Sequence, residues 1–263
     1  MTWIKRHLLM VAALVVLAYL LIPNLVVAIF SFNNPRGRYN YQWNEFSTAA
    51  WRDPCGNPGI CEALGLSLRI GVIASLVATI LGTLIAFALG RHRFRGRSGT
   101  NLLIFMPMAT PEVVMGSSLL TLFVMAGVPS GAVNITIAHI MFCLSFVVVA
   151  VKARVSSLDP RLEEAAADLG ANAFHTFIRV TLPLAAPGIA AGALLAFSLS
   201  FDDYIITNFN ASPSSITFPM YVWGAAQRGT PVEIFVVGTV MFLIALTVVV
   251  IGQLLSARRE RLA

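Results

Sequence analysis

The chain alternates long apolar segments with shorter polar ones, and this pattern predicts a bundle of membrane-spanning helices. A helix needs about 20 predominantly apolar residues to cross a bilayer. Six segments meet this requirement: residues 8–30, 65–89, 101–126, 132–151, 186–207 and 233–256. Helices are the expected spanning form because lipid offers no partners for free backbone groups, and no β-barrel alternation is visible. We therefore expect an all-α membrane protein with six transmembrane helices.

The polar interval at residues 152–185 predicts two short helices joined by a bend. Asp159 is suited to cap the first helix, with Pro160 at its first position. Gly170 can supply the left-handed residue that ends this helix, and Asn172 can cap the second one. The interval is therefore expected to be structured rather than a simple linker.

Positive charges gather on one side of the predicted topology. With six spans both termini share a side, and that side carries thirteen basic residues: Lys5, Arg6, Arg91, Arg93, Arg95, Arg97, Lys152, Arg154, Arg161, Arg179, Arg258, Arg259 and Arg261. The opposite side carries four, namely Arg36, Arg38, Arg52 and Arg228. Because basic loops stay inside, both termini and the 152–185 loop are expected in the cytoplasm. The loops 31–64 and 208–232 are expected outside the cytoplasm.

Composition supports a single membrane domain over residues 1–263. The chain is 57% hydrophobic and 11% charged, whereas soluble domains carry about 25% charged residues. The net charge of +6 lies mainly in short loops beside the spans, so it reflects topology rather than nucleic-acid binding.

The sequence offers no pattern for catalysis or metal binding. There is no G-x-x-x-x-G-K-[ST] loop, and neither of the two lysines, Lys5 and Lys152, follows a glycine. There is also no H-E-x-x-H motif and no G-x-S-x-G elbow, and the four histidines share no metal-ligand spacing. We expect no catalytic residue, metal site or cofactor in this chain. His139, inside a predicted span, is expected to be a hydrogen-bonded packing residue.

Three acidic residues lie within or near the ends of predicted spans, where a charge is costly unless it faces a partner or a water-filled path. Glu112 lies midway along the third span, close to Pro107 and Pro111, which each remove a backbone donor and favour a kink. Asp202 and Asp203 lie toward the outer end of the fifth span. Adjacent residues point in different directions on a helix, so one could face a path while the other contacts a neighbouring helix. Such carboxylates suit a cationic solute.

Aromatic residues near these acids offer two interpretations. Tyr204 adjoins Asp203, and Trp223 follows in the predicted outer loop. They could contact a cation through their ring faces. They could equally form part of an interfacial aromatic belt, while the two aspartates serve as helix-end residues held by local hydrogen bonds.

The cysteines and one glycine pair suggest local structure. Cys55 and Cys61 lie in an outer loop rich in Gly and Pro, which permits a disulfide, although two unpaired thiols are the alternative. Cys143 lies in an apolar span and suits packing. Gly188 and Gly192 form a small face for close helix packing, either within the chain or against another subunit.

The 152–185 interval resembles the EAA loop of ABC-importer permeases. The matching pattern is Glu164-Ala165-Ala166, three residues, Gly170, nine residues, Val180, one residue and Leu182-Pro183, with Val180 where the family usually has Ile. The resemblance implies a type I importer permease fold in the cytoplasmic membrane of a prokaryote. It also implies that the loop couples to a separate ATPase through Glu163, Glu164, Ala165, Ala166, Gly170, Leu182 and Pro183.

This family resemblance implies several partners. Two copies of an ATPase subunit would bind ATP and Mg, a second permease subunit would complete the path, and an extracytoplasmic solute-binding protein would deliver the ligand. The segments PEVVMGSSLLTLF, LEEAAADLGANAF, SFDDYIITNF and FPMYVW resemble the spermidine/putrescine branch. This implies a polyamine substrate. The acids and aromatic residues considered above are then the candidates for its path: Glu112, Asp202, Asp203, Tyr204 and Trp223.

Other functions share some of these features. Related permeases carry other organic cations, amino-acid derivatives or metal complexes. An ion-coupled secondary transporter would also contain intramembrane acids, but it has no need of an EAA-type loop, and no internal repeat is visible. A membrane scaffold without transport activity would leave the acids in the spans unexplained.

Overall fold

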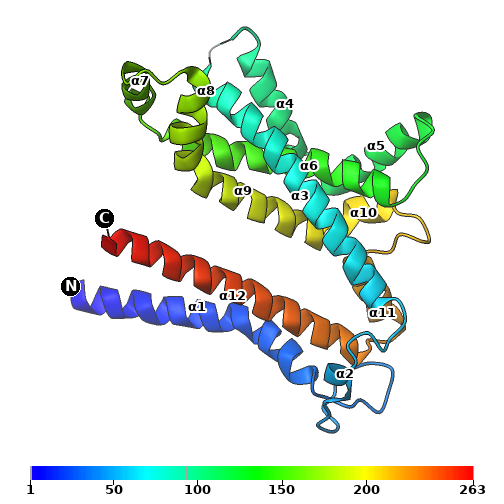
Figure 1. Ribbon diagram of the computed structural model, residues 1–263. Helices are drawn as coiled ribbons and strands as arrows, with labels where there is room; N and C mark the ends of the chain where they lie inside the picture. The colour runs from blue at the N-terminus through cyan, green and yellow to red at the C-terminus, as the bar shows by residue number, and fades with distance from the viewer. Residues whose placement is uncertain (1, 93, 263) are drawn as a thin grey trace. The chain divides into compact units, whose positions relative to one another are not determined.

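The computed structural model describes residues 2–92 and 94–262, with side chains described for 7–92 and 94–252. In this described part the chain is helical and contains no named strand; Asn33 and Phe46 form an isolated bridge. The helices are α1 Thr2–Phe30, α2 Ala49–Arg52, α3 Ile60–Arg91, α4 Arg97–Ala109, α5 Glu112–Met125, α6 Ala132–Ser156, α7 Arg161–Asp168, α8 Ala173–Thr176, the π-helix η1 Phe177–Thr181, α9 Leu182–Asp202, α10 Ile205–Asn210, α11 Phe218–Arg228 and α12 Val232–Leu262 (Figure 1).

The helices divide into two compact units. One comprises residues 1–62 and 221–263, and the other comprises residues 63–220. In the first unit α1 and α12 pack side by side, and Phe30 meets Phe235 with ring centroids 6.4 Å apart. In the second unit α6 packs against α9 and α4, while α10 packs against α5.

Within the described residues, five helical segments are long and apolar enough to cross a membrane, and a bent pair of helices supplies a sixth candidate. The single segments are His7–Phe30, Ile60–Arg91, Ala132–Ser156, Ala173–Asp202 and Val232–Gly252. They correspond to five of the six apolar segments of the sequence. The helical prediction is therefore confirmed, but the boundaries and one continuous span need correction.

The third predicted span, residues 101–126, is not one continuous helix. α4 and α5 meet at a bend of 108°. Thr110, with ψ of 131°, and Pro111, with ψ of 132°, are both extended. A residue before proline is driven out of the helical region, which explains why the chain breaks at Thr110. Pro107 lies inside α4. Of the two prolines that favour a kink, only Pro111 therefore lies at the break between the helices.

The fifth predicted span, residues 186–207, also ends differently. The helical segment extends from Ala173 to Asp202, and the chain turns at Asp203, where ψ is 125°. A separate short helix, α10, follows. The apolar residues Ile205 and Ile206 made the span appear to continue, but the Asp203 carboxylate accepts backbone hydrogen bonds from α10 and competes with helix extension.

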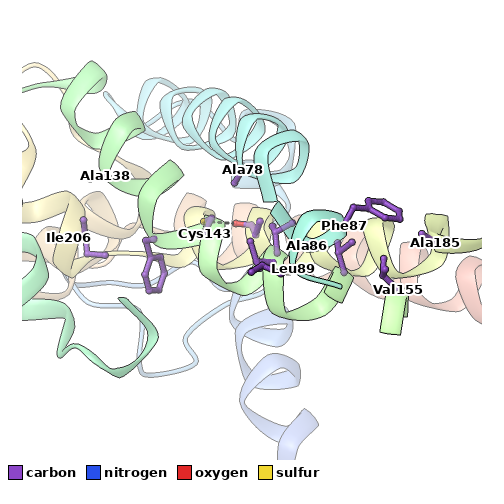
Figure 2. Packing of buried hydrophobic residues seen from close by; sticks show 14 of the residues in the cluster. Ala78, Ala86, Phe87, Leu89, Ala138, Cys143, Val155, Ala185 and Ile206 are labelled. Atoms are coloured by element: carbon purple, nitrogen blue, oxygen red, sulfur yellow. Dashed lines mark hydrogen bonds between the residues drawn. The ribbon is translucent and has the colours of Figure 1, made fainter. Parts of the chain in front are cut away.

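The hydrophobic core of the second unit lies along α6. Small residues from neighbouring helices, including Ala78, Ala86, Ala185 and Ala196, are fully buried against it (Figure 2). The buried Cys143 thiol donates to the Ala196 carbonyl at 3.3 Å, which agrees with a packing role.

Gly188 and Gly192 face α6 within the same chain. A Cβ at Gly188 would lie 2.5 Å from Arg154 Cβ, and one at Gly192 would lie 3.5 Å from Val147 Cγ1. The two glycines therefore allow α9 to approach α6. The sequence left open whether this small face served the chain itself or another subunit, and the structure answers in favour of the chain itself.

We expect Gly188→Ala to destabilise the protein. The added methyl group meets Arg154 Cβ, which cannot rotate away, and overpacking of this kind costs about 1–3 kcal/mol. Thermal unfolding in detergent measures the effect. Gly65→Ala in α3 is the matched control because a Cβ there meets nothing within 4 Å. Equal stability of the two variants would contradict the close packing of α6 and α9.

Candidate functional site

The segment from α7 to α8 forms a structured turn with defined caps at both helices. The Ala171 N–H donates to Ala166 O at 3.0 Å and the Gly170 N–H donates to Ala167 O at 2.9 Å, a Schellman motif that ends α7. Gly170 has φ of +82°, the left-handed conformation expected from the sequence. Asn172 caps α8 by accepting the His175 N–H at 2.9 Å.

At the start of α7 the capping differs slightly from expectation. The helix begins at Arg161, and Pro160 occupies the position before it with helical dihedral angles. The Asp159 carboxylate still accepts a backbone hydrogen bond, from the Arg161 N–H at 3.0 Å. Asp159 therefore satisfies one of the free donors at this helix end.

The two neighbouring glutamates of α7 have different surroundings. Glu163 Oε1 lies 3.2 Å from Arg91 Nε of α3 and accepts the Thr181 hydroxyl, also at 3.2 Å. Glu164 and Ala165 are exposed, while Ala166 is half-buried. Glu163 thus fastens α7 to its own chain, and Glu164 is the glutamate of the pair that is available to another molecule.

Large apolar side chains are exposed around the α7–α8 turn. Leu169 is 90% exposed, Phe174 is 71% exposed and Leu162 is 45% exposed. Leu169 and Phe174 flank the Gly170 bend. These three residues were not predicted from the sequence. In an amphipathic helix the sequence alone does not show whether an apolar side chain packs against the protein or stays exposed. Leu182, by contrast, packs against the core, and Pro183 is exposed.

Asp203 belongs to a buried polar cluster that joins α6, α9 and α10. His139 Nε2 lies 3.3 Å from Asp203 Oδ1 and 3.0 Å from Thr207 Oγ1, and His139 Nδ1 lies 2.7 Å from Ser200 Oγ. Asp203 Oδ1 also accepts the Thr207 N–H at 2.8 Å and the Thr207 hydroxyl at 2.9 Å. His139 is hydrogen-bonded in the interior, as the sequence led us to expect.

The two adjacent aspartates differ in burial and in hydrogen bonding. Asp203 is 9% exposed and its oxygens accept hydrogen bonds from the start of α10, whereas Asp202 is exposed on the last turn of α9. Of the two interpretations of this pair, local hydrogen bonding fits Asp203. No hydrogen bond of the Asp202 side chain is seen among the described residues, so its assignment to a substrate path stays a prediction.

Glu112 lies at the bend between α4 and α5. It is the first residue of α5 and it is exposed. A carboxylate at a helix N-terminus is favoured by the helix dipole. Irregular backbone at membrane depth is tolerated where it lines protein or a water-filled cavity. Glu112 therefore lies exposed at a break in the helical backbone.

The two aromatic candidates lie in different parts of the chain. Tyr204 is half-buried at the start of α10, directly after Asp203. Trp223 is 56% exposed on α11 and belongs to the unit of residues 1–62 and 221–263. Tyr221, also on α11, donates its hydroxyl to Asn57 Oδ1 at 2.6 Å. Burial raises the pKa of this hydroxyl, and the nearby Glu233 carboxylate raises the pKa further.

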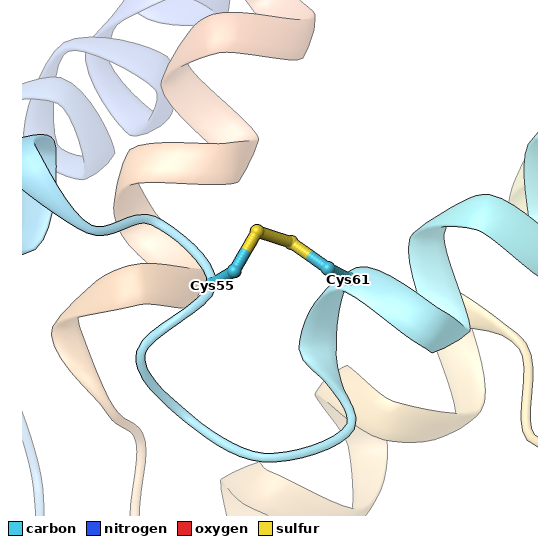
Figure 3. Close-up of a disulfide and its surroundings, with 2 residues drawn as sticks. All are labelled: Cys55 and Cys61. Carbon is cyan, nitrogen blue, oxygen red and sulfur yellow. A yellow bond between two sulfur atoms is a disulfide. The ribbon is translucent and has the colours of Figure 1, made fainter.

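A disulfide joins Cys55, in the loop before α3, to Cys61 in the first turn of α3, with their Cα atoms 5.5 Å apart (Figure 3). Gly59, between them, has φ of +84° and allows the chain to turn. Earlier in the loop the Asn33 amide donates to Asn40 Oδ1 and to Gln42 O, both at 2.7 Å. The loop is therefore held by a covalent bridge at one end and a buried amide network at the other.

Two further polar residues in the second unit were not singled out from the sequence. Asn134 and Asn210 are fully buried, and the Asn134 side-chain atoms have no hydrogen-bond partner in the described part of the chain. The Asn210 amide donates to Ile206 O at 2.8 Å. For Asn134 the signal in the sequence is a single amide in the apolar segment 132–151, whereas Asn210 lies in the predicted loop 208–232, where an amide gives no such signal.

Residues 78–262 match the protein family described as the binding-protein-dependent transport system inner membrane component. The chain belongs to this family. It is a multi-pass permease subunit of an ABC importer in the cytoplasmic membrane.

Two relatives and one solved structure extend this assignment. The spermidine/putrescine transport system permease protein PotC of Escherichia coli (strain K12) is 36% identical over 244 residues, covering 93% of this chain and 92% of PotC. The putrescine transport system permease protein PotI of the same strain is 38% identical over 250 residues, covering 92% of this chain and 88% of PotI. A bacterial alginate ABC transporter in complex with an alginate pentasaccharide-bound periplasmic protein is 16% identical, with a TM-score of 0.68 and coverage of 97% of this chain and 96% of that chain. This similarity supports the type I importer fold.

Proposed function

We propose that this permease subunit imports a polyamine such as spermidine or putrescine. The observation that carries the proposal is the 36% and 38% identity to polyamine permeases over more than nine-tenths of the chain. The carboxylates Glu112 and Asp202 are consistent with it, because both are exposed and a polyamine carries several ammonium groups that carboxylates can bind.

The orientation follows from the charge distribution of the loops. We infer that both termini and the α7–α8 segment lie in the cytoplasm, since the predicted inner side carries thirteen basic residues and the outer side four. The disulfide loop then lies outside the cytoplasm, where oxidation is permitted. This orientation directs the exposed apolar residues Leu169 and Phe174 toward the compartment that contains ATP.

ATP hydrolysis is assigned to a separate subunit. Two copies of an ATPase would bind ATP and Mg, and one would receive the α7–α8 surface formed by Leu162, Glu164, Ala165, Leu169 and Phe174. The exposure of Leu162, Leu169 and Phe174 supports this role, because clustered apolar side chains on a protein surface mark sites of contact with other proteins. A second permease subunit and an extracytoplasmic solute-binding protein complete the proposed importer.

The proposal is tested by uptake in a strain that lacks its own polyamine permeases. Expression of this chain with its neighbouring transport subunits is expected to restore ATP-dependent uptake of labelled spermidine or putrescine. Unlabelled polyamine should compete, whereas a neutral solute such as a sugar should not. If the transporter takes up another cation and an excess of polyamine does not inhibit that uptake, the substrate is not a polyamine. Uptake driven by an ion gradient in this chain alone would refute the importer function.

A further inference from the structure

A groove lies between α4 and α6, and none of its lining residues is assigned a role in the proposed transport function. It has a volume of about 230 Å³, below the roughly 300–1,000 Å³ of sites that enclose a drug-sized ligand. Its walls are formed by the first half of α4 and the last turns of α6, and both helices belong to the same unit. The groove therefore suits part of a molecule rather than a complete solute.

The groove is polar at one end and apolar along its length. Asn101, Lys152 and Ser156 line the end where α4 begins and α6 ends. Phe105 and Val148 lie four residues further along each helix, which corresponds to about 6 Å toward the middle of the span. This order, with a charge near the membrane surface and apolar walls beneath it, matches the order of groups in a phospholipid.

Lys152 supplies the charge of the groove. Its ammonium group donates to Asn101 Oδ1 at 2.7 Å. Among the described residues, the carboxylates that lie within 4 Å of a basic side chain are Glu163, beside Arg91, and Asp203, beside His139. No carboxylate in that part of the chain therefore neutralises Lys152.

Neighbouring basic residues are directed elsewhere. Arg154 Nε donates to Leu184 O at 3.0 Å, and Arg97 Nη2 donates to Leu89 O at 2.6 Å. These guanidinium groups bind backbone carbonyls of α9 and α3. Lys152 is therefore the charged group that lines the groove and offers two remaining ammonium hydrogens to a ligand.

We propose that this groove is a binding site for an anionic phospholipid. The Lys152 ammonium and the Ser156 hydroxyl hold the phosphate, and the first part of an acyl chain lies along Phe105, Val148 and Val149. Basic pockets between membrane helices recognise headgroups in this way, because the phosphate supplies the counter-charge that the protein lacks. By filling the groove, the lipid also fixes α4, the helix that leads to the bend carrying Glu112.

The test is lipid retention by the protein purified in mild detergent with its co-purifying subunits. Native mass spectrometry is used to compare phosphatidylglycerol with phosphatidylcholine of the same acyl chains. We expect the wild-type protein to retain phosphatidylglycerol preferentially. Lys152→Gln should reduce that preference about fivefold, the effect of about one basic group near an anionic lipid surface. Gln can still donate to Asn101, so the contact between the two helices is kept.

Two control variants make the result decisive. Lys152→Arg keeps the charge and should retain the preference for phosphatidylglycerol. Arg95→Gln removes one positive charge from an exposed loop position outside the groove and should leave the preference unchanged. Equal retention by the wild-type protein and Lys152→Gln would overturn the proposal. An equal loss in Arg95→Gln would also overturn it, since the effect would then reflect net charge rather than this site.

Discussion

Replacement of Asp202 by Asn is expected to lower polyamine uptake strongly while the protein still accumulates in the membrane. Asp202 is exposed at the end of α9. Loss of its charge removes a charge-assisted contact to an ammonium group but leaves no buried partner unsatisfied. Hydrogen bonds to charged groups contribute about 1.5–3 kcal/mol, so uptake at low polyamine concentration should fall about tenfold to a hundredfold.

The adjacent Asp203 provides a sharp contrast. Asp203→Ala would leave His139 and Thr207 without their acceptor and would remove the cap of α10. Leaving a buried donor without its acceptor costs about 1–3 kcal/mol for each group. We therefore expect Asp203→Ala to reduce the amount of folded protein, whereas Asp202→Asn should not.

Initial uptake rates of labelled spermidine, divided by the amount of permease in the membrane, separate these effects. Thermal unfolding in detergent reports on folding independently. Asp202→Glu is the matched variant that keeps the charge, and it should retain more uptake than Asp202→Asn. Unchanged uptake in Asp202→Asn would remove this residue from the substrate path. Normal stability of Asp203→Ala would show that the buried cluster is not structurally important.

The helical architecture was predictable from the sequence because membrane helices require long apolar segments. Five single helices and the bent pair correspond to the six segments. The breaks at Thr110 and Asp203 were harder to predict. Pro107 and Pro111 both favour a kink, yet α4 continues through Pro107 and the helix breaks only before Pro111. At Asp203 the apolar residues that follow concealed a capping interaction whose acceptor is a side chain.

In the candidate site, too, local features were predictable from the sequence and contacts between distant residues were not. Local backbone features, such as the Gly170 bend and the Asn172 cap, follow from residue preferences and were predicted. The engagement of Glu163 by Arg91 could not be predicted, since the two residues lie 72 positions apart in the sequence. The same holds for the contact of His139 with Asp203. Burial separates Asp202 from Asp203 although their side chains are chemically identical.

The second large effect is expected at the α7–α8 surface. Gly170→Asp should uncouple ATP hydrolysis from uptake. Gly170 has φ of +82° and open space around its Cα, so a side chain there causes backbone strain of roughly 1–2 kcal/mol rather than a collision. The strain weakens the Schellman motif and displaces Leu169 and Phe174, which we propose to contact the ATPase. Glu164→Lys should act similarly by reversing an exposed charge, without backbone strain.

The ratio of ATP hydrolysed to polyamine imported measures coupling, and co-purification measures ATPase binding. Gly96→Asp is a matched control, because Gly96 has φ of +94° and equally open surroundings but lies in the loop before α4. It introduces the same strain and the same charge outside the proposed docking surface, so coupling should be retained. Deletion of residues 163–170 should release the ATPase altogether. A normal transport ratio in both Gly170→Asp and Glu164→Lys, with the ATPase still bound, would show that the force of ATP binding reaches the permease through another surface.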